Sequence, residues 1–214
     1  EIDIGPRRAA TSGRAAVLAL LTLVAAAPAA SANPNFRSVI DRVQPPQPGL
    51  KVQVLGFDQN LQLTNRTGKL VVILGYENEP YVRLRPDGTV QENENSPARY
   101  LNSDRYGTSS PPPSAGADRP VVWRTLDRSG RFTWHDHRMH WMSSTPPPAV
   151  TDTSKRTRIF AYMVPLEVGG RATAIHGTLY WVGRTGGGMP AWAIASLIVV
   201  SLGALTAVVV TRRR

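Results

Sequence analysis

The chain has 214 residues, of which 42% are hydrophobic, a formal net charge of +10 at pH 7 and no cysteine. This length fits one domain with additional segments, and the lack of cysteine excludes disulfide bonds, thiolate metal sites and cysteine catalysis. Glycine and proline number 18 each, which favours many turns over long helices.

The first 32 residues have the pattern of a secretory signal peptide. Arg7, Arg8 and Arg14 precede an apolar run over 15–27, and Ala30-Ser31-Ala32 supplies a small-residue cleavage site. A basic start, a short apolar run and small residues at the cleavage point are typical of such signals. We therefore expect a signal peptide at 1–32 that is cleaved after Ala32. An uncleaved N-terminal anchor helix is the alternative.

Residues 190–210 form a run without a charged side chain. As a helix, this run would extend about 31 Å, which matches the hydrocarbon core of a bilayer. Three arginines at 212–214 follow it, and positive residues stay on the cytoplasmic side of a membrane. We therefore predict a single-pass protein of the cell membrane, with a Gly-rich tether at 184–189, a cytoplasmic basic tail at 211–214 and an extracytoplasmic domain at 33–183.

The charge of the predicted exported part is mild. Outside the signal peptide and the terminal arginines, the chain has 19 basic and 13 acidic residues and no basic run. A nucleic-acid-binding protein needs a clustered basic face, so no nucleic-acid partner is predicted. The expected partners are the lipid bilayer, through residues 190–210, and a membrane protein.

Between the two ends, apolar residues recur with the period of two that is typical of β-strands. Turn residues separate the runs, among them Pro86-Asp87-Gly88 and Gly169-Gly170, whose backbone preferences suit tight turns. We expect residues 50–74 to form a meander and residues 92–119 a long polar connection. The predicted strands cover 35–43, 50–55, 61–64, 69–74, 81–84, 89–91, 120–126, 131–137, 157–168 and 171–182.

Many short strands without a helical stripe predict a mainly β fold. We expect an antiparallel two-sheet sandwich, immunoglobulin-like or copper-resistance-protein-like, followed by the C-terminal transmembrane helix. A small barrel is the alternative. The residues expected to be buried include Val71, Val72, Leu74, Val122, Ile159 and Leu179.

Several segments of the exported part resemble those of one family. They read LGYENEPYVRLRPDG, NSPARYLNSDRYG, WHDHRMHWM and VPLEVGGRATAIHGTLYWV. They resemble an uncharacterised family of actinobacterial secreted proteins with a single C-terminal transmembrane helix and a W-H-D-H-R-x-H-W-M segment. The resemblance implies the same topology and no particular activity.

The segment Trp134–Met142 concentrates residues that could bind a metal. It contains three of the four histidines. On a strand, His135 and His137 would point to the same face, about 6.6–6.8 Å apart along the chain. Either His140 or the distant His176 could then supply a third imidazole. Imidazole suits zinc and copper, and thioether sulfur suits copper(I), so copper or zinc is the expected metal. The candidate sulfur donors are Met139, Met142 and Met163.

A structural role for the same segment is the alternative. Trp134 and Trp141 could be core or interface residues, and Asp136 and Arg138 could pair with each other on the opposite face of the strand. The histidines would then be solvated or would bond to loop carbonyls.

A second candidate site is Glu77-Asn78-Glu79, whose paired carboxylates could serve acid–base chemistry or bind a cation. A solvated loop between two strands is the alternative. The sequence has no G-x-S-x-G elbow, no phosphate-binding loop and no dinucleotide fingerprint, so no enzyme is predicted.

Two functions follow from these observations. The first is a membrane-anchored extracytoplasmic binding or accessory module without enzymatic activity. The second is a copper- or zinc-binding protein that uses segment 135–142, with His135, His137, His140 and His176 as candidate ligands. A metal-dependent hydrolase is a weaker third hypothesis, because the sequence shows no general base beyond the two carboxylates.

Overall fold

The structure is a computed structural model that describes residues 35–183 and residue 196. Within this described part, no helix is long and apolar enough to cross a membrane. The signal peptide and the membrane anchor therefore stay predictions from the sequence. The predicted segments that lie outside the described residues are 1–32, 184–189, 190–210 except residue 196, and 211–214.

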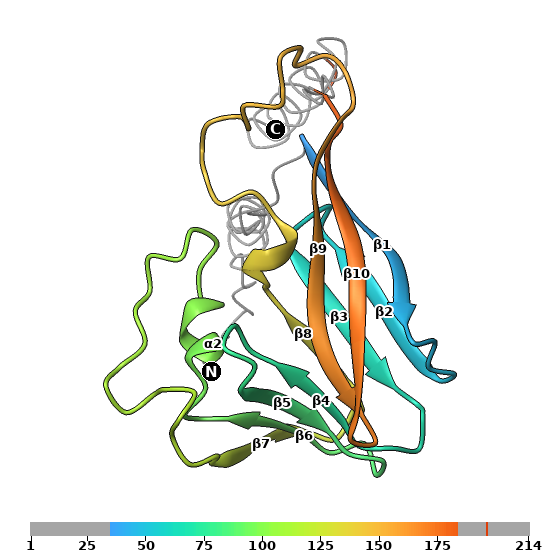
Figure 1. The fold of residues 1–214 in the computed structure, drawn as a ribbon, viewed down its shortest axis with the longest axis vertical. Helices are drawn as coiled ribbons and strands as arrows, with labels where there is room; N and C mark the ends of the chain where they lie inside the picture. Colours follow the sequence, from blue (N-terminus) through green and yellow to red (C-terminus); the bar gives the residue numbers. More distant parts are fainter. Residues whose placement is uncertain (1–34, 184–195, 197–214) are drawn as a thin grey trace, which may run out of the picture. The chain divides into compact units, whose positions relative to one another are not determined.

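The described domain is mainly β, with two antiparallel sheets and almost no helix. Its elements are β1 (Phe36–Gln44), β2 (Leu50–Leu55), β3 (Asn60–Asn65), β4 (Val71–Leu74), β5 (Pro80–Leu84), β6 (Val90–Asn93), α2 (Pro97–Leu101), β7 (Trp123–Asp127), β8 (Arg131–Trp134), the 3₁₀ turn η1 (His137–Met139), β9 (Thr157–Val168) and β10 (Arg171–Trp181). The larger sheet has the order β1-β10-β9-β4-β5-β6-β7, and the smaller has the order β2-β3-β8 (Figure 1).

The longest elements are β9 and β10, which pair along their whole length and are joined by Gly169-Gly170. Both glycines have positive φ angles, +58° and +74°, as a tight two-residue hairpin turn requires. β1 pairs with β10, and β4 pairs with β9. Figure 1 shows β4 to β7 gathered at one end of this hairpin, which therefore forms the spine of the larger sheet.

The two sheets share one main core. Along β9, Tyr162, Val164, Leu166 and Val168 are buried, and the residues between them are exposed or half-buried, because successive side chains of a strand point to opposite faces. The smaller sheet adds buried residues from β3 and β8 to the same cluster. These are Leu61, Leu63 and Trp134.

The core predictions were correct in part. Val71 and Leu179 are fully buried, as expected. Val72, Leu74 and Ile159 are half-buried. Val122 is 45% exposed, so the prediction for this residue was wrong. It precedes β7, the edge strand of the larger sheet, where one side lacks a neighbouring strand.

The predicted meander over 50–74 was also wrong. β2 and β3 do pair, but β3 pairs next with β8, and β4 pairs with β5 and β9 in the other sheet. Asn65 accounts for the change of sheet. Its side chain accepts a hydrogen bond from Thr67 N (3.0 Å) and donates one to Lys69 O (2.8 Å), so it stabilises a bend instead of a hairpin.

The long connection over 92–119 contains the short helix α2, which was not predicted. Ser96 caps it by accepting a hydrogen bond from Ala98 N (3.2 Å), and Pro97 occupies its first turn. Serine at the cap followed by proline is a helix-start signal. The helix has only five residues, too few to show a helical period.

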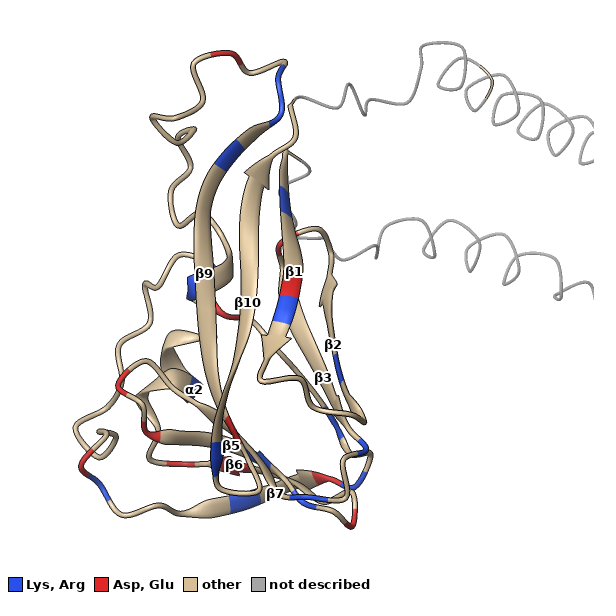
Figure 2. Ribbon diagram, turned by 45° about the vertical axis from the view of Figure 1, so that its right-hand side comes forward, with Lys and Arg blue, Asp and Glu red and all other residues tan. Residues whose placement is uncertain are grey.

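Charged residues are interspersed on the described domain. In the view of Figure 2, basic and acidic residues alternate along β1 and around the loops at the end where β5 to β7 lie. That view shows no continuous strip of basic or of acidic residues. This side of the domain therefore has no surface of a single charge that would attract a charged ligand.

Candidate metal centre

The chain leaves the smaller sheet at Trp134 and turns. The buried Asp136 side chain accepts hydrogen bonds from Arg138 N (3.1 Å) and from Trp134 Nε1 (2.8 Å). An aspartate that satisfies the backbone of the next turn competes with strand pairing, so η1 forms at His137–Met139. The strand predicted over 131–137 is therefore present only over 131–134, and the prediction of a shared strand face for its histidines was wrong.

Arg138 fastens this turn to the larger sheet. Its Nε and Nη2 atoms each lie 2.8 Å from the Asp136 carboxylate. Its Nη1 and Nη2 atoms donate to the carbonyls of Gly75 and Leu74, both at 3.2 Å, and its guanidinium lies 4.8 Å from the centre of the Tyr76 ring. The pairing of Asp136 with Arg138 is thus present, and it holds the turn beside the end of β4.

Three histidines meet at this turn. The ring centres of His135 and His140 are 4.3 Å apart, and the centre of the His137 ring lies 5.3 and 5.4 Å from these two. One nitrogen from each ring lies within 4.8 Å of the others. The turn, and not a strand face, brings these rings close enough that they could hold one metal ion.

Each of the three rings directs one nitrogen at a backbone carbonyl. His135 Nδ1 lies 2.5 Å from Gln59 O, His137 Nε2 lies 2.7 Å from Asp104 O, and His140 Nδ1 lies 3.1 Å from Trp141 O. A carbonyl oxygen only accepts, so these nitrogens carry the ring protons. In the neutral form of such a ring, the other nitrogen carries the lone pair. Metal-binding histidines commonly donate their second ring N–H in this way.

Two of these lone pairs are buried without a hydrogen-bond partner. His135 Nε2 and His140 Nε2 make no hydrogen bond to any described residue. An unsatisfied buried polar atom typically costs about 1–3 kcal/mol. A cation bound between the rings would accept both lone pairs, so the donor set fits a metal ion.

Burial also keeps the rings in the form that binds metals. Burial, with smaller contributions from the nearby His135 and Arg105, lowers the pKa of His140 to about 3. Burial likewise lowers the pKa of His135, with smaller contributions from His137 and Arg105. Both imidazoles are therefore neutral at pH 7, as metal ligation requires.

A surface pocket opens beside the histidines. It has a volume of about 300 Å³ and is lined by His137, His140, Trp141, Met142, Ser143 and Phe160. Met142 is 37% exposed, so its side chain borders both the pocket and solvent. An ion could enter through this pocket.

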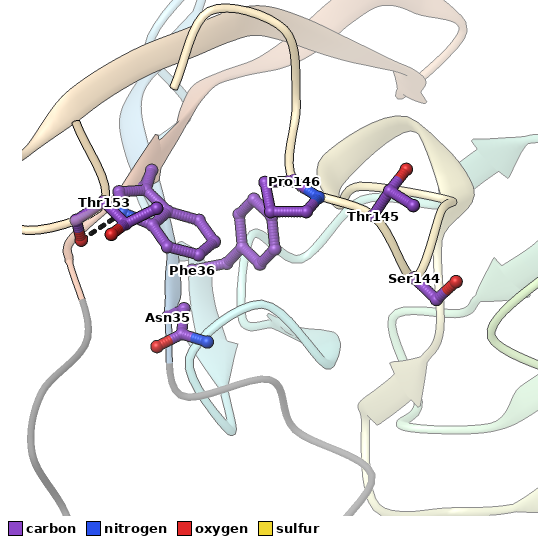
Figure 3. A pocket seen from close by; sticks show the side chains of 7 residues that line it. Asn35, Phe36, Ser144, Thr145, Pro146 and Thr153 are labelled. Atoms are coloured by element: carbon purple, nitrogen blue, oxygen red, sulfur yellow. Dashed lines mark hydrogen bonds between the residues drawn. The ribbon is translucent and has the colours of Figure 1, made fainter. Parts of the chain in front are cut away.

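A second pocket of about 200 Å³ lies near the other end of β1 and β10. Figure 3 shows Phe36 beside Pro146, with Asn35 and Thr153 around them. Phe36 packs edge-to-face on Trp181, with ring centres 5.2 Å apart. Neither a titratable side chain nor a nucleophilic cluster lines this pocket, so we assign it a packing role.

The structure separates the remaining predicted ligands. His176 lies on β10, opposite Arg42 of β1 and Met163 of β9, and outside the three-histidine group. Met139 is fully buried in the core. Of the three predicted sulfur donors, Met142 is the one that borders the histidine pocket.

The predicted acidic pair has a structural role. Glu77 is exposed, but Glu79 is buried. Glu79 accepts hydrogen bonds from Ser96 Oγ (2.7 Å) and from Glu77 N (3.0 Å). It braces the β4–β5 turn against the start of α2, so the solvated-loop interpretation was wrong for Glu79, and the two carboxylates form no acid–base pair.

Sequence reasoning missed the loops that hold the rings. Asp104, whose carbonyl faces His137, accepts hydrogen bonds from the backbone of Tyr106, Thr108 and Ser109 at 2.8–3.1 Å. Arg105 forms a buried ion pair with Asp58 at 2.6 Å, which joins this loop to the turn before β3. The turn at Asp104 can be predicted from the sequence. Which side chain its backbone carbonyl contacts cannot be predicted in this way.

Comparison with protein-family models, with curated proteins and with solved structures finds no match to this chain. No relative therefore assigns an activity or a ligand. Function has to be inferred from the chemistry of the site itself.

Proposed function

We propose that this chain is a metal-binding protein in which His135, His137 and His140 coordinate one copper or zinc ion outside the cytoplasmic membrane. The observation that carries the proposal is the pair of buried nitrogens, His135 Nε2 and His140 Nε2, that have no hydrogen-bond partner. One ring nitrogen of each of His135, His137 and His140 lies within 4.8 Å of the others. The neutral rings of His135 and His140, together with the neighbouring ring of His137, would supply three nitrogen ligands.

The three histidines alone do not complete the coordination of a tetrahedral ion. Three protein ligands leave a fourth coordination position open, whereas structural zinc sites are closed by four. The open position would face the pocket of about 300 Å³. Imidazole ligands suit both metals, and copper(II) generally binds more tightly than zinc(II) to a given nitrogen site.

A purely structural role explains only part of the geometry. The ring N–H groups do bond to loop carbonyls of Gln59, Asp104 and Trp141, and those contacts hold the loops. They account for one nitrogen of each ring. They leave the buried lone pairs of His135 and His140 without a partner. A bound ion would be that partner.

Calorimetric titration of the 214-residue chain, purified in detergent without a histidine tag, tests this proposal. At pH 7.5 we expect one copper(II) or zinc(II) ion per chain with micromolar or tighter affinity. His135→Ala, His137→Ala and His140→Ala should each abolish this binding. His176→Ala is the matched control and should keep it. Absence of binding by the wild-type chain, or binding that all three variants keep, would contradict the proposal.

The extracytoplasmic setting is part of the proposal and is supported by the sequence patterns at 1–32 and 190–214. Protease added to intact spheroplasts should digest the domain at 33–183. A domain that survives until the cells are lysed would show that the orientation is reversed.

A further inference from the structure

We infer that the three-histidine site selects copper(I) and that Met142 supplies its fourth ligand, a thioether sulfur. This inference rests on the proposed metal-binding function. It goes beyond that function by naming the oxidation state of the ion and the residue that completes its coordination.

Met142 is placed on the same side of the chain as a metal ligand. It follows His140 by two residues, and His140 has an extended backbone with φ −139° and ψ 166°. Alternate side chains of an extended chain point to the same side. Consistent with this, Met142 and His140 line the same pocket, together with His137.

Gly107 brings Met142 close to the third imidazole. A β-carbon at this position would lie 3.0 Å from Met142 Cε, 3.3 Å from His137 Cε1 and 3.6 Å from His137 Nδ1. The methionine methyl group and the lone-pair nitrogen of His137 therefore border the same small volume. Gly107 has a φ of +65°, a conformation that favours glycine, and it leaves this volume unfilled.

The Met142 side chain is able to move into a coordinating position. It is 37% exposed and borders the pocket, and methionine has three rotatable bonds. Met139 is fully buried in the core, and Met163 is 52% exposed on β9 opposite His176. Among the methionines of residues 35–183, Met142 is thus the one that is both partly exposed and close to the three histidines.

The charge of the site favours a monovalent ion. Within the described residues, the group of potential ligands holds three imidazoles and no carboxylate. The carboxylate of Asp136 is paired with Arg138, and that of Asp104 accepts backbone N–H groups. No carboxylate of this group would neutralise the bound ion in this partly buried site. The free-energy cost of burying an ion is lower for a charge of one than for a charge of two. Thioether ligands also select copper(I).

The test is a competition titration of the 214-residue chain in detergent. Copper(I) is added without oxygen against a chromophoric copper(I) chelator, and zinc(II) is titrated against a zinc chelator. Met142→Leu removes the sulfur and keeps the volume, and Met163→Leu is its matched control. Losing even an outer partner of a metal ligand typically costs about 10–100-fold in affinity, so we expect Met142→Leu to weaken copper(I) binding at least about tenfold. Zinc(II) affinity should change less than twofold, and Met163→Leu should change neither.

The outcomes separate this inference from the proposed function. If the wild-type chain binds zinc(II) or copper and Met142→Leu leaves copper(I) affinity unchanged, Met142 is not a ligand and the inference fails alone. Equal losses for both ions would mean that Met142 acts through packing, which also overturns it. If the wild-type chain binds neither ion, the proposed function fails with it. X-ray absorption at the copper edge gives the direct readout: a sulfur scatterer in the wild type that Met142→Leu removes.

Discussion

Two regions of the domain bring histidine and methionine together by different means. On the β9–β10 hairpin, His176 and Met163 lie opposite each other because the strand register places them there. In segment 134–142, three histidines meet because the chain has left its strand and turned at Asp136. Backbone hydrogen bonds between strands hold the first region in place, and side-chain hydrogen bonds hold the second.

This difference determines which rings are left with unsatisfied atoms. In a strand pair, the backbone groups satisfy one another, and side chains face either the core or solvent. At the turn, loop carbonyls take the ring protons of His135, His137 and His140, and burial keeps water from two of the remaining nitrogens. Ring nitrogens that could bind a metal are therefore found where β-strand pairing ends.

The largest effect is expected from Asp136→Ala. The change removes the carboxylate that pairs with Arg138, caps η1 and accepts the Trp134 indole. Breaking a buried ion pair by removing one partner typically costs about 3–5 kcal/mol, and we expect a loss of that order in the free energy of unfolding, measured in urea. Metal binding should be lost as well, because His137 begins the turn that this residue caps.

Asp41→Ala is the matched control in the other region. Asp41 is exposed on β1 and accepts a hydrogen bond from Thr178 of β10 at 2.8 Å. A typical hydrogen bond contributes about 0.5–1.5 kcal/mol, so the loss of stability should be at the low end, and metal affinity should not change. If Asp136→Ala costs no more than Asp41→Ala, side-chain hydrogen bonds do not hold the turn. Asp136→Asn, which keeps the shape, covers the case in which the alanine variant does not fold.

Gly177→Ala should destabilise the β9–β10 hairpin without changing metal affinity at the histidine turn. A β-carbon at Gly177 would overlap the Tyr162 ring and lie 2.6 Å from Val39 O. Overpacking of this kind typically costs about 1–3 kcal/mol, which urea unfolding would detect. Metal affinity, measured where the variant is folded, should match that of the wild type. A large loss of affinity would show that the hairpin and the histidine turn are coupled.

The sequence predicted the hairpin well because its signals are local. The bounds of β2 and β9 match the predicted ranges, and β10 ends one residue earlier than expected. The alternation of buried residues and the Gly-Gly turn both depend only on residues that are close together in the sequence. The change of sheet after β3 was missed because it depends on which distant strand β3 meets, and that information is not local.

The histidine cluster was expected from the composition of segment 134–142, but its geometry was not predicted. Three of the four candidate histidines converge, but they do so through η1 and not through a strand face. The capping aspartate was visible in the sequence, yet its choice between capping and strand pairing depends on Arg138 and the end of β4. Gln59 and Asp104 contribute only backbone carbonyls, and any residue type would supply these.

The stability of the metal-free protein should fall in acid because of the buried turn. An unfolded histidine titrates near pH 6.5, whereas burial, together with the nearby His135 and Arg105, lowers the pKa of folded His140 to about 3. Between these values the unfolded chain binds a proton that the folded chain does not. This group thus stabilises the fold above about pH 6.5, and its contribution is lost by up to about 1.4 kcal/mol per pH unit as the pH falls towards 3.

Urea unfolding at pH 7 and at pH 5, without metal, measures this slope. His140→Gln removes the titrating group and should flatten the slope, and His176→Gln on the hairpin should leave it as in the wild type. Equal slopes for wild type and His140→Gln would show that the ring at this turn is not held neutral by burial.

The smallest effect is expected from a pair of tryptophans that divide between the two regions. Trp141 donates its indole N–H to Thr145 O (2.7 Å), and Trp181 of β10 donates to Thr153 O (3.0 Å). Trp181 is only 4% exposed, whereas Trp141 is half-buried. Replacing each by phenylalanine removes the donor, but at Trp181 it also leaves a gap in the packing around Phe36.

Trp141→Phe should therefore lower the free energy of unfolding by about 0.5 kcal/mol, because water replaces the lost donor at a partly exposed site. Trp181→Phe should cost more, since a cavity term adds to the lost hydrogen bond. Neither change should alter metal affinity, because His140 bonds to the backbone carbonyl of residue 141 and not to its indole. Isothermal titration of both variants checks this. A loss of affinity confined to Trp141→Phe would mean that the indole, through its contact with the loop, and not the backbone alone, sets the orientation of the His140 ring.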